Sequence, residues 1–153
     1  EIFHTIHDCL AEEYEIYVPL SYGNKIYGET VVQAGKELFG EHFHAIVDYM
    51  PEPVYINFLN SMDVGIFNNN RQQAMGNIGI LLQLGKTVYL RNDTSMYAHY
   101  LKQGVVIRDI NEIESCYGIR KISYEEQAVN KSLMEENWKG LHKIKQWEEV
   151  FSC

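Results

Sequence analysis

The sequence has few cysteines and too little positive charge for several classes of protein. Its three cysteines, Cys9, Cys116 and Cys153, lie far apart, which is typical of free thiols in a reducing compartment rather than of a disulfide framework. They form no Cys-x-x-Cys pair and no close Cys/His group, so their spacing gives no signal for zinc. The net charge of −8 argues against a nucleic-acid partner, which requires a basic face.

Long apolar segments are also missing from the sequence. No run approaches the ~20 residues that a membrane-spanning helix needs, and no signal peptide is visible. With 153 residues, 46% of them hydrophobic, the chain has the length and composition of one globular domain. It begins without Met inside a stretch, 1–13, that is expected to be helical, so we expect upstream sequence to be missing.

Short apolar segments alternate with longer helical ones over most of the chain. This alternation, with strands that are nearly all apolar, predicts an α/β fold with a Rossmann-like parallel sheet and helices on both faces. We expect it to occupy residues 1–120, truncated at its N-terminus. The expected strands are 15–20, 43–49, 63–67, 87–90 and 105–107, and the expected helices are 27–39, 53–61, 71–84 and one from the cap at 92–94 to about Lys102.

A helical tail is expected over residues 121–153. Ser123 and Glu126 have the spacing of a capping box that opens a helix. Apolar residues then recur every three to four positions with charges between them, which is an amphipathic pattern interrupted near Gly140. Two interpretations stay open: the tail packs on its own domain, or part of it covers another domain.

The segment from Asp63 to Leu90 carries the strongest functional signal. Its expected order is strand, polar loop (68–70), helix (71–84) and strand. Open α/β folds bind ligands where the strands end, and the free N–H groups of a first helical turn favour an anion such as phosphate. The segment therefore predicts a ligand that carries phosphate.

Four polar residues, Asn70, Arg71, Gln72 and Gln73, stand at the expected start of this helix. An Asn at the N-cap with a Gln at N3 can serve only to start the helix. Arg71 favours a further role, because a guanidinium beside free N–H groups can bind phosphate oxygens through charge-assisted hydrogen bonds.

Two glycines, Gly76 and Gly79, lie inside the expected helix, where each costs about 1 kcal/mol relative to Ala. This cost indicates the close approach of a ligand or of another backbone, and close helix–strand packing explains the glycines about as well as a ligand does. Asn77 beside Gly76 is an unusual polar choice.

Polar or aromatic residues follow the other expected strands as well. After the first strand, Tyr22, Gly23 and Asn24 form either an ordinary turn or one wall of a cleft. After the second strand, Tyr49 and Met50 either sandwich a nucleobase or lie in the core or at its rim. Because the carboxyl ends of parallel strands share one sheet edge, we expect these groups to converge. The candidate contacts to a sugar, base or phosphate are Tyr22, Gly23, Asn24, Tyr49, Met50, Tyr55, Asn68 and Arg91, the last being alternatively a solvated charge.

Motifs of several other enzyme classes are incomplete or absent. Gly85-Lys86-Thr87 resembles the end of a P-loop, but Gly79 is one residue too far away and the order is helix then strand, so Gly85 is expected to end the helix. Neither G-x-S-x-G nor G-x-G-x-x-G occurs. No acidic metal-binding motif stands out, so we predict no essential metal and no cofactor.

Several motifs together resemble those of one family. They are YVPLSYGN (17–24), VQAGKELFG (32–40), NNRQQAMGN (69–77) and LLQLGKTVYLRND (81–93). They resemble the TDP-Fuc4NAc:lipid II transferases, glycosyltransferase family 56, which transfer 4-acetamido-4,6-dideoxygalactose in enterobacterial common antigen synthesis. The resemblance covers about Tyr17 to Asp109.

The resemblance implies the C-terminal, donor-binding half of a GT-B enzyme. A dTDP-sugar would be the donor, its diphosphate held by Arg71, Gln72, Gln73 and Asn77, and stabilisation of the leaving diphosphate would drive catalysis. A lipid-linked saccharide would be the acceptor, bound through a missing N-terminal domain that would also supply any catalytic base. The implied location is the cytoplasm, or the inner face of the bacterial inner membrane through peripheral attachment.

Two further functions stay open at this point. The chain is alternatively a non-catalytic α/β module that binds a nucleotide or a protein, with its tail associating through Trp138 and Trp147. A nucleotide-sugar epimerase of GT-B fold is the third alternative, and it would need no acceptor.

Overall fold

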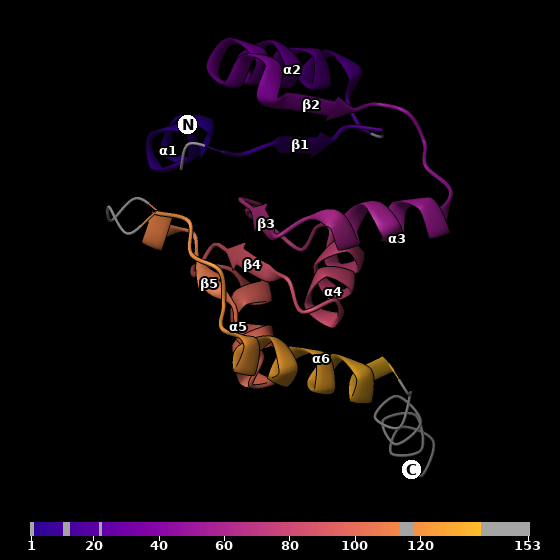
Figure 1. The fold of residues 1–153 in the computed structure, drawn as a ribbon, viewed down its shortest axis with the longest axis vertical. Coiled ribbons are helices and arrows are strands. Elements are labelled where there is room, and N and C mark those ends of the chain that lie inside the picture. The colour runs from indigo at the N-terminus through magenta and orange to yellow at the C-terminus, as the bar shows by residue number, and fades with distance from the viewer. Residues whose placement is uncertain (1, 11–12, 22, 114–117, 139–153) are drawn as a thin grey trace. The chain divides into compact units, whose positions relative to one another are not determined.

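The computed structural model describes residues 2–10, 13–21, 23–113 and 118–138 (Figure 1). The chain forms two compact units, one of Glu1–Tyr55 and Glu112–Ile119 and the other of Ile56–Asn111 and Arg120–Cys153. All described strands pair in parallel, in one sheet of two strands and one of three, and helices flank them. The predicted α/β class is confirmed, whereas the expected boundary near residue 120 stays a prediction.

The first unit is built around its two-stranded sheet. Its elements are α1 (Ile2–Cys9), β1 (Ile16–Pro19), α2 (Lys25–Phe39), the 3-10 helix η1 (Gly40–His42), β2 (Phe43–Ile46) and the start of α3 (Glu52–Ser61). Phe3 packs edge-on against Phe39 and Phe43, with ring centroids 5.6 and 5.8 Å apart. A Cβ on Gly35 would overlap the Phe43 ring, so glycine lets α2 pack against β2.

The second unit contains the three-stranded sheet. Its elements are β3 (Val64–Phe67), α4 (Met75–Gln83), β4 (Thr87–Leu90), α5 (Ser95–Lys102), β5 (Arg108–Asp109) and α6 (Tyr124–Trp138). β4 is the middle strand and is buried at every position, as an apolar strand of a parallel sheet should be. Ile78 and Leu82 of α4 are fully buried, so this helix supplies much of the core.

Helix α6 packs on α4 (Figure 1). The Met134 methyl would lie 3.8 Å from a Cβ on Gly79, so this glycine faces the other helix. Asn130 of α6 is completely buried and bonds to the backbone of Val106. The part of the tail that the structure describes therefore packs on its own unit, while 139–153 lie outside the described residues.

The sequence correctly predicted the start or end of several helices. Thr94 caps α5 by accepting from the Tyr97 N–H, and Ser123 and Glu126 form both hydrogen bonds of the capping box. Gly40 ends α2 at φ +56°. Gly85 follows α4 at φ +74°, and its N–H and that of Lys86 donate to Leu82 and Leu81 as in a Schellman motif.

Two predicted elements are wrong in position, and two others end early: the helix expected over 1–13 ends at Cys9, and the strand expected over 43–49 ends at Ile46. The helix expected from Arg71 begins at Met75, and Ala74 before it has the left-handed conformation, φ +55° and ψ +23°. The strand expected at 105–107 lies instead at Arg108–Asp109. The strand does not form at 105–107 because the Asn130 side-chain amide bonds to both the N–H and the C=O of Val106, at 2.8 Å each. These two backbone groups are then not available for pairing with a neighbouring strand.

Among the residues that the structure describes, none of the helices combines the length and the apolarity that a membrane span requires.

Candidate functional site

The two strand ends of the second unit meet at one edge of its sheet. Phe67 of β3 is in register with Leu90 of β4, and both strands run in the same direction. Asn68 and Arg91 directly follow this pair, so the structure brings these two predicted residues to neighbouring positions. The carboxyl edge of a parallel sheet is the usual ligand-binding edge of open α/β folds.

The loop between β3 and α4 carries the residues that were predicted to hold phosphate. Arg71, Gln72 and Gln73 are all exposed and lie in this loop. Their predicted place in the first helical turn is wrong, as are the roles of Asn70 as N-cap and Gln73 as N3. The change frees their side chains from capping, and a loop can present them to a ligand together.

The start of α4 lacks a side-chain cap among the described residues, since Ala74 occupies the N-cap position. The N–H groups of a first helical turn have no intrahelical acceptor and carry the positive end of the helix dipole. Asn77 lies in this turn and is half-buried. A Cβ on Gly76 would meet nothing within 4 Å, so open space lies beside the start of the helix.

Arg91 is held in a fixed position by its own loop. Its guanidinium donates to both carboxylate oxygens of Asp93, at 3.0 and 2.7 Å, and this pairing lowers the pKa of Asp93. The Arg91 carbonyl accepts from the Thr94 hydroxyl at 2.8 Å. Because Asp93 offsets its charge, Arg91 attracts an anion less strongly than Arg71 would.

The corresponding edge of the first unit is built differently. Pro19 of β1 is in register with Ile46 of β2, and Leu20 extends the ladder by donating to the Ile46 carbonyl at 2.7 Å. Asn24 caps α2 by accepting from the Tyr27 N–H at 3.1 Å. Gly23 has φ +114°, a conformation that favours glycine, which fits a βα turn. Tyr22 lies outside the described residues.

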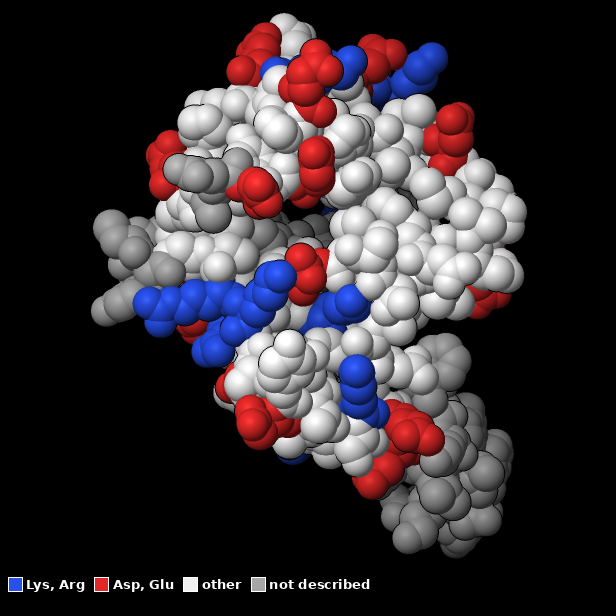
Figure 2. Space-filling view, in the orientation of Figure 1, with Lys and Arg blue, Asp and Glu red and all other residues white. Residues whose placement is uncertain are grey.

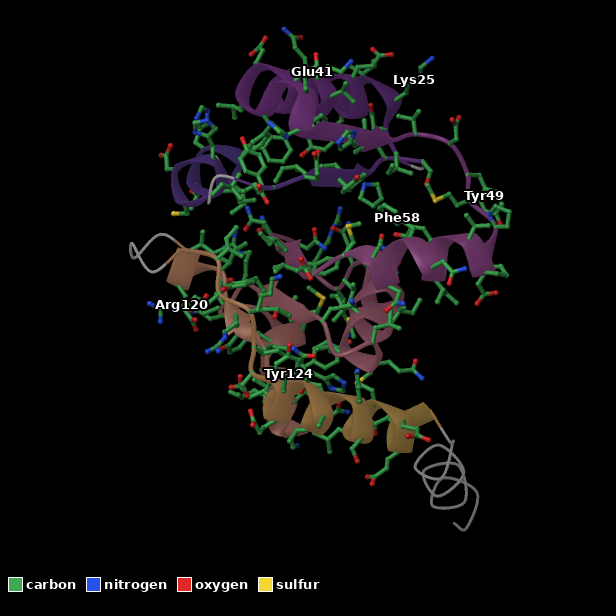
Figure 3. All side chains as sticks on the ribbon, viewed as in Figure 1. Lys25, Glu41, Tyr49, Phe58, Arg120 and Tyr124 are labelled. Carbon is green, nitrogen blue, oxygen red and sulfur yellow. The ribbon has the colours of Figure 1, made fainter. Side chains whose placement is uncertain are left out.

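A pocket of about 220 Å³ lies at this edge. Tyr49, 83% exposed, stands at the connection between β2 and α3, where Figure 3 labels it. Tyr49, Met50 and Tyr55 line this pocket together, and the contact with a nucleobase that was predicted for them stays a prediction. Pro19, Ser21, Ile46 and Glu52 were not predicted to lie here. The lining residues are Pro19, Ser21, Ile46, Asp48, Tyr49, Met50, Glu52 and Tyr55.

The missed residues had only a weak signal in the sequence. Glu52 stands between two prolines, a pattern that predicts only a turn, and Pro19 and Ser21 come from the end of β1 rather than from the connection between β2 and α3. Their common location depends on the register of β1 with β2, which no local pattern encodes. The convergence of all four strand ends in one cleft stays a prediction.

An exposed cluster of one carboxylate and two imidazoles lies near the start of β1 and β2. Glu15 bonds to His44 at 2.7 Å and to His42 at 3.4 Å, and the His44 bond is the main cause of a lowered pKa for Glu15. Among the described residues, no group of three or more His, Cys, Asp or Glu side chains is arranged to hold a metal.

The sequence matches the family of 4-alpha-L-fucosyltransferases, glycosyl transferase group 56, over residues 1–138. The match covers most of the chain, and the chain therefore belongs to this family. The matched region extends beyond residues 17–109, which carry the resemblance, and includes α6. No solved structure matches the chain. A glycosyltransferase uses a nucleotide-sugar donor and an acceptor, and this membership favours the transferase over the non-catalytic module and the epimerase.

Proposed function

We propose that this member of glycosyltransferase family 56 is the donor-binding part of an enzyme of GT-B architecture. Its donor is a dTDP-linked amino-deoxy sugar of the Fuc4NAc type, and its acceptor is a lipid-linked saccharide of surface polysaccharide synthesis, enterobacterial common antigen being the pathway that the resemblance implies. The acceptor binds through a further, N-terminal domain. The enzyme works in the cytoplasm at the inner face of the inner membrane.

The diphosphate of the donor binds at the loop between β3 and α4. The observation that supports this most is an exposed Arg71 in a loop that leads into a helix start without a side-chain cap. A guanidinium and free N–H groups both favour phosphate oxygens. Gln72, Gln73 and Asn77 add amide donors within the same segment.

Asn68 and Arg91 contribute to the same edge. Their positions follow from the register of β3 with β4, and the bidentate pair with Asp93 fixes the direction of the Arg91 guanidinium. Arg91 then positions the sugar or the diphosphate rather than supplying most of the attraction. The remaining predicted contacts among the described residues, Gly23, Asn24 and Tyr49, belong to the first unit, and Tyr22 stays a predicted contact.

Catalysis in this proposal depends on stabilising the diphosphate as it leaves. Negative charge grows on the diphosphate oxygens when the bond to the sugar breaks, and donors that are already oriented stabilise that charge at little cost of reorganisation. Arg71 is the only cation in the loop from Asn68 to Ala74. Its removal should therefore affect the transition state more than the binding of the intact donor.

Calorimetric titration of the full chain with dTDP tests the proposal. Replacement of Arg71 with Ala should weaken binding about 10- to 100-fold, since a hydrogen bond to a charged group contributes about 1.5–3 kcal/mol. Lys102→Ala, an exposed cation on α5 of the same unit, is the matched control and should leave the affinity unchanged. Equal weakening by both variants, or no binding of dTDP, would contradict this site, and tighter binding of UDP would contradict the choice of dTDP.

A further inference from the structure

The pocket of the first unit has a chemistry that does not suit phosphate. Its lining contains two carboxylates, Asp48 and Glu52, and no Lys or Arg among the residues that the structure describes. In Figure 2, the surface over the start of α3 is white and red, and no blue residue lies on that part of the visible face. Two carboxylates would repel a diphosphate, so an occupant of this pocket has to be neutral or positive.

The size of the pocket is that of about one ring of a ligand. Pockets for drug-sized ligands span about 300–1,000 Å³, and this one has about 220 Å³. A whole nucleotide sugar would not fit inside it. One six-membered ring with its substituents is the appropriate scale.

The lining offers apolar surface and hydrogen-bond acceptors together. Tyr49, Tyr55, Met50 and Pro19 provide the apolar surface on which the C–H face of a ring can pack, and tyrosine combines such a face with a polar end. The carboxylates accept short, strong hydrogen bonds from hydroxyl groups. The occupant that fits therefore has an apolar face and several hydroxyl donors on one ring.

We infer that this pocket, formed by Pro19, Ser21, Ile46, Asp48, Tyr49, Met50, Glu52 and Tyr55, is a subsite for a neutral pyranose ring. A pyrimidine base fits less well, because its N3–H lies between two carbonyl oxygens that the carboxylates would repel. The subsite rests on membership of a glycosyltransferase family and is independent of the diphosphate site proposed for the second unit. Both the donor and the acceptor of such an enzyme carry a sugar, and the ring comes from one of them.

The test uses methyl N-acetyl-α-D-glucosaminide as a neutral pyranose probe with the full ¹⁵N-labelled chain. Addition of the probe should shift the amide signals of the non-proline residues of 46–55, and thymidine should shift them much less. No shift up to the solubility limit of the probe, shifts confined to other residues, or larger shifts with thymidine would overturn the inference. Shifts of residues 68–77 with pyrophosphate alone report on the diphosphate site, so the failure of one site is distinguishable from the failure of the other.

Two conservative variants identify the groups that bind the ring. Glu52→Gln should weaken binding of the glycoside about tenfold, which corresponds to a charge-assisted hydrogen bond of about 1.4 kcal/mol. Tyr49→Ala should weaken it severalfold, and because this side chain is 83% exposed, its loss removes no buried packing. Glu29→Gln, an exposed carboxylate on α2, is the control. Unchanged affinity in both pocket variants would overturn the inference.

A competition experiment separates the two sources of the sugar. If a dTDP-hexose displaces the glycoside from the pocket, the ring is that of the donor. If the dTDP-hexose and the glycoside bind at the same time, the ring is that of the acceptor. Either result supports the pyranose subsite, since both require the glycoside to bind there.

Discussion

In the second unit, the loop that follows β3 exposes Arg71 and two glutamines beside the start of α4, whereas in the first unit the residues that follow β2 line a pocket with two carboxylates. Both regions lie at the carboxyl edge of a parallel pair of strands, the place where open α/β folds bind ligands. Equal topology therefore does not imply equal chemistry. The side chains that follow each strand decide whether the edge attracts an anion or a neutral ring.

The two edges also use their helix starts differently. Asn24 caps α2 in the first unit and thereby satisfies one of its first N–H groups. The start of α4 has Ala74 in this position, with no side-chain cap among the described residues. At the first edge the Asn24 side chain thus occupies one N–H group that an anion would use, whereas among the described residues no side chain does so at the start of α4.

Replacement of the buried Asn130 with Ala should have the largest effect, and it should be concentrated in the second unit. The change leaves the N–H and C=O of Val106 without their partner, and two such part-buried groups cost about 2–4 kcal/mol. Urea unfolding measures the loss, and amide exchange should show faster exchange at Val106 than in β1 and β2. The exposed Ser132→Ala on the same helix is the control, and similar stability of the two variants would contradict the prediction.

Reversing the charge of Arg71 should remove the preference of the second unit's sheet edge for an anion. Arg71→Glu should weaken binding of pyrophosphate about 100-fold or more, because a lost charge-assisted bond is joined by repulsion. Binding of the methyl glycoside should not change, since Arg71 does not line the pocket. Titration of one protein sample with each ligand in turn provides the internal control. Weakening of both ligands to the same degree would show general damage to the fold.

Local signals predicted much of the fold. The strand expected at 87–90 coincides with β4, and the capping box at Ser123 and Glu126 forms as expected. Both depend on residues that are close in sequence, which is why pattern reasoning finds them. The phosphate prediction for Arg71 also came from local order, and it stays a prediction, with Arg71 in the loop before α4 rather than in its first turn.

The parts that were not predicted depend on distant residues. The expected strand at 105–107 is replaced because Asn130, 24 positions later, takes the backbone groups of Val106. The pocket needs Pro19 beside Ile46, a pairing set by strand register. The later start of α4 reflects the left-handed conformation of Ala74, which no propensity for alanine indicates.

The left-handed backbone conformation of Ala74, before α4 in the second unit, predicts a smaller effect on stability. A left-handed alanine costs about 1–3 kcal/mol in the folded state, and glycine relieves this strain. Glycine also makes the unfolded chain more flexible, which favours unfolding, so the net gain in stability from Ala74→Gly should be about 0.5–1 kcal/mol. Ala98→Gly, an exposed position inside α5, should instead destabilise it by about 1 kcal/mol. Thermal unfolding measures both. A loss of stability in Ala74→Gly comparable with that of Ala98→Gly would show that the conformation is unstrained.

The smallest expected effect concerns the opposite end of the first sheet, where Glu15 bonds to His44 and His42. The pKa of Glu15 is lowered in the folded state, first by the hydrogen bond with His44, so the carboxylate stabilises the fold above its ordinary pKa. This contribution should fade as the pH falls through the lowered value. Glu15→Gln should therefore lower the unfolding midpoint slightly at neutral pH and converge with the unmodified protein in acid. The difference is small because all three side chains are exposed to water.

Glu29→Gln, measured over the same pH range, is the control and should show no such convergence. A Glu15→Gln difference that stays constant or grows in acid would contradict the assignment.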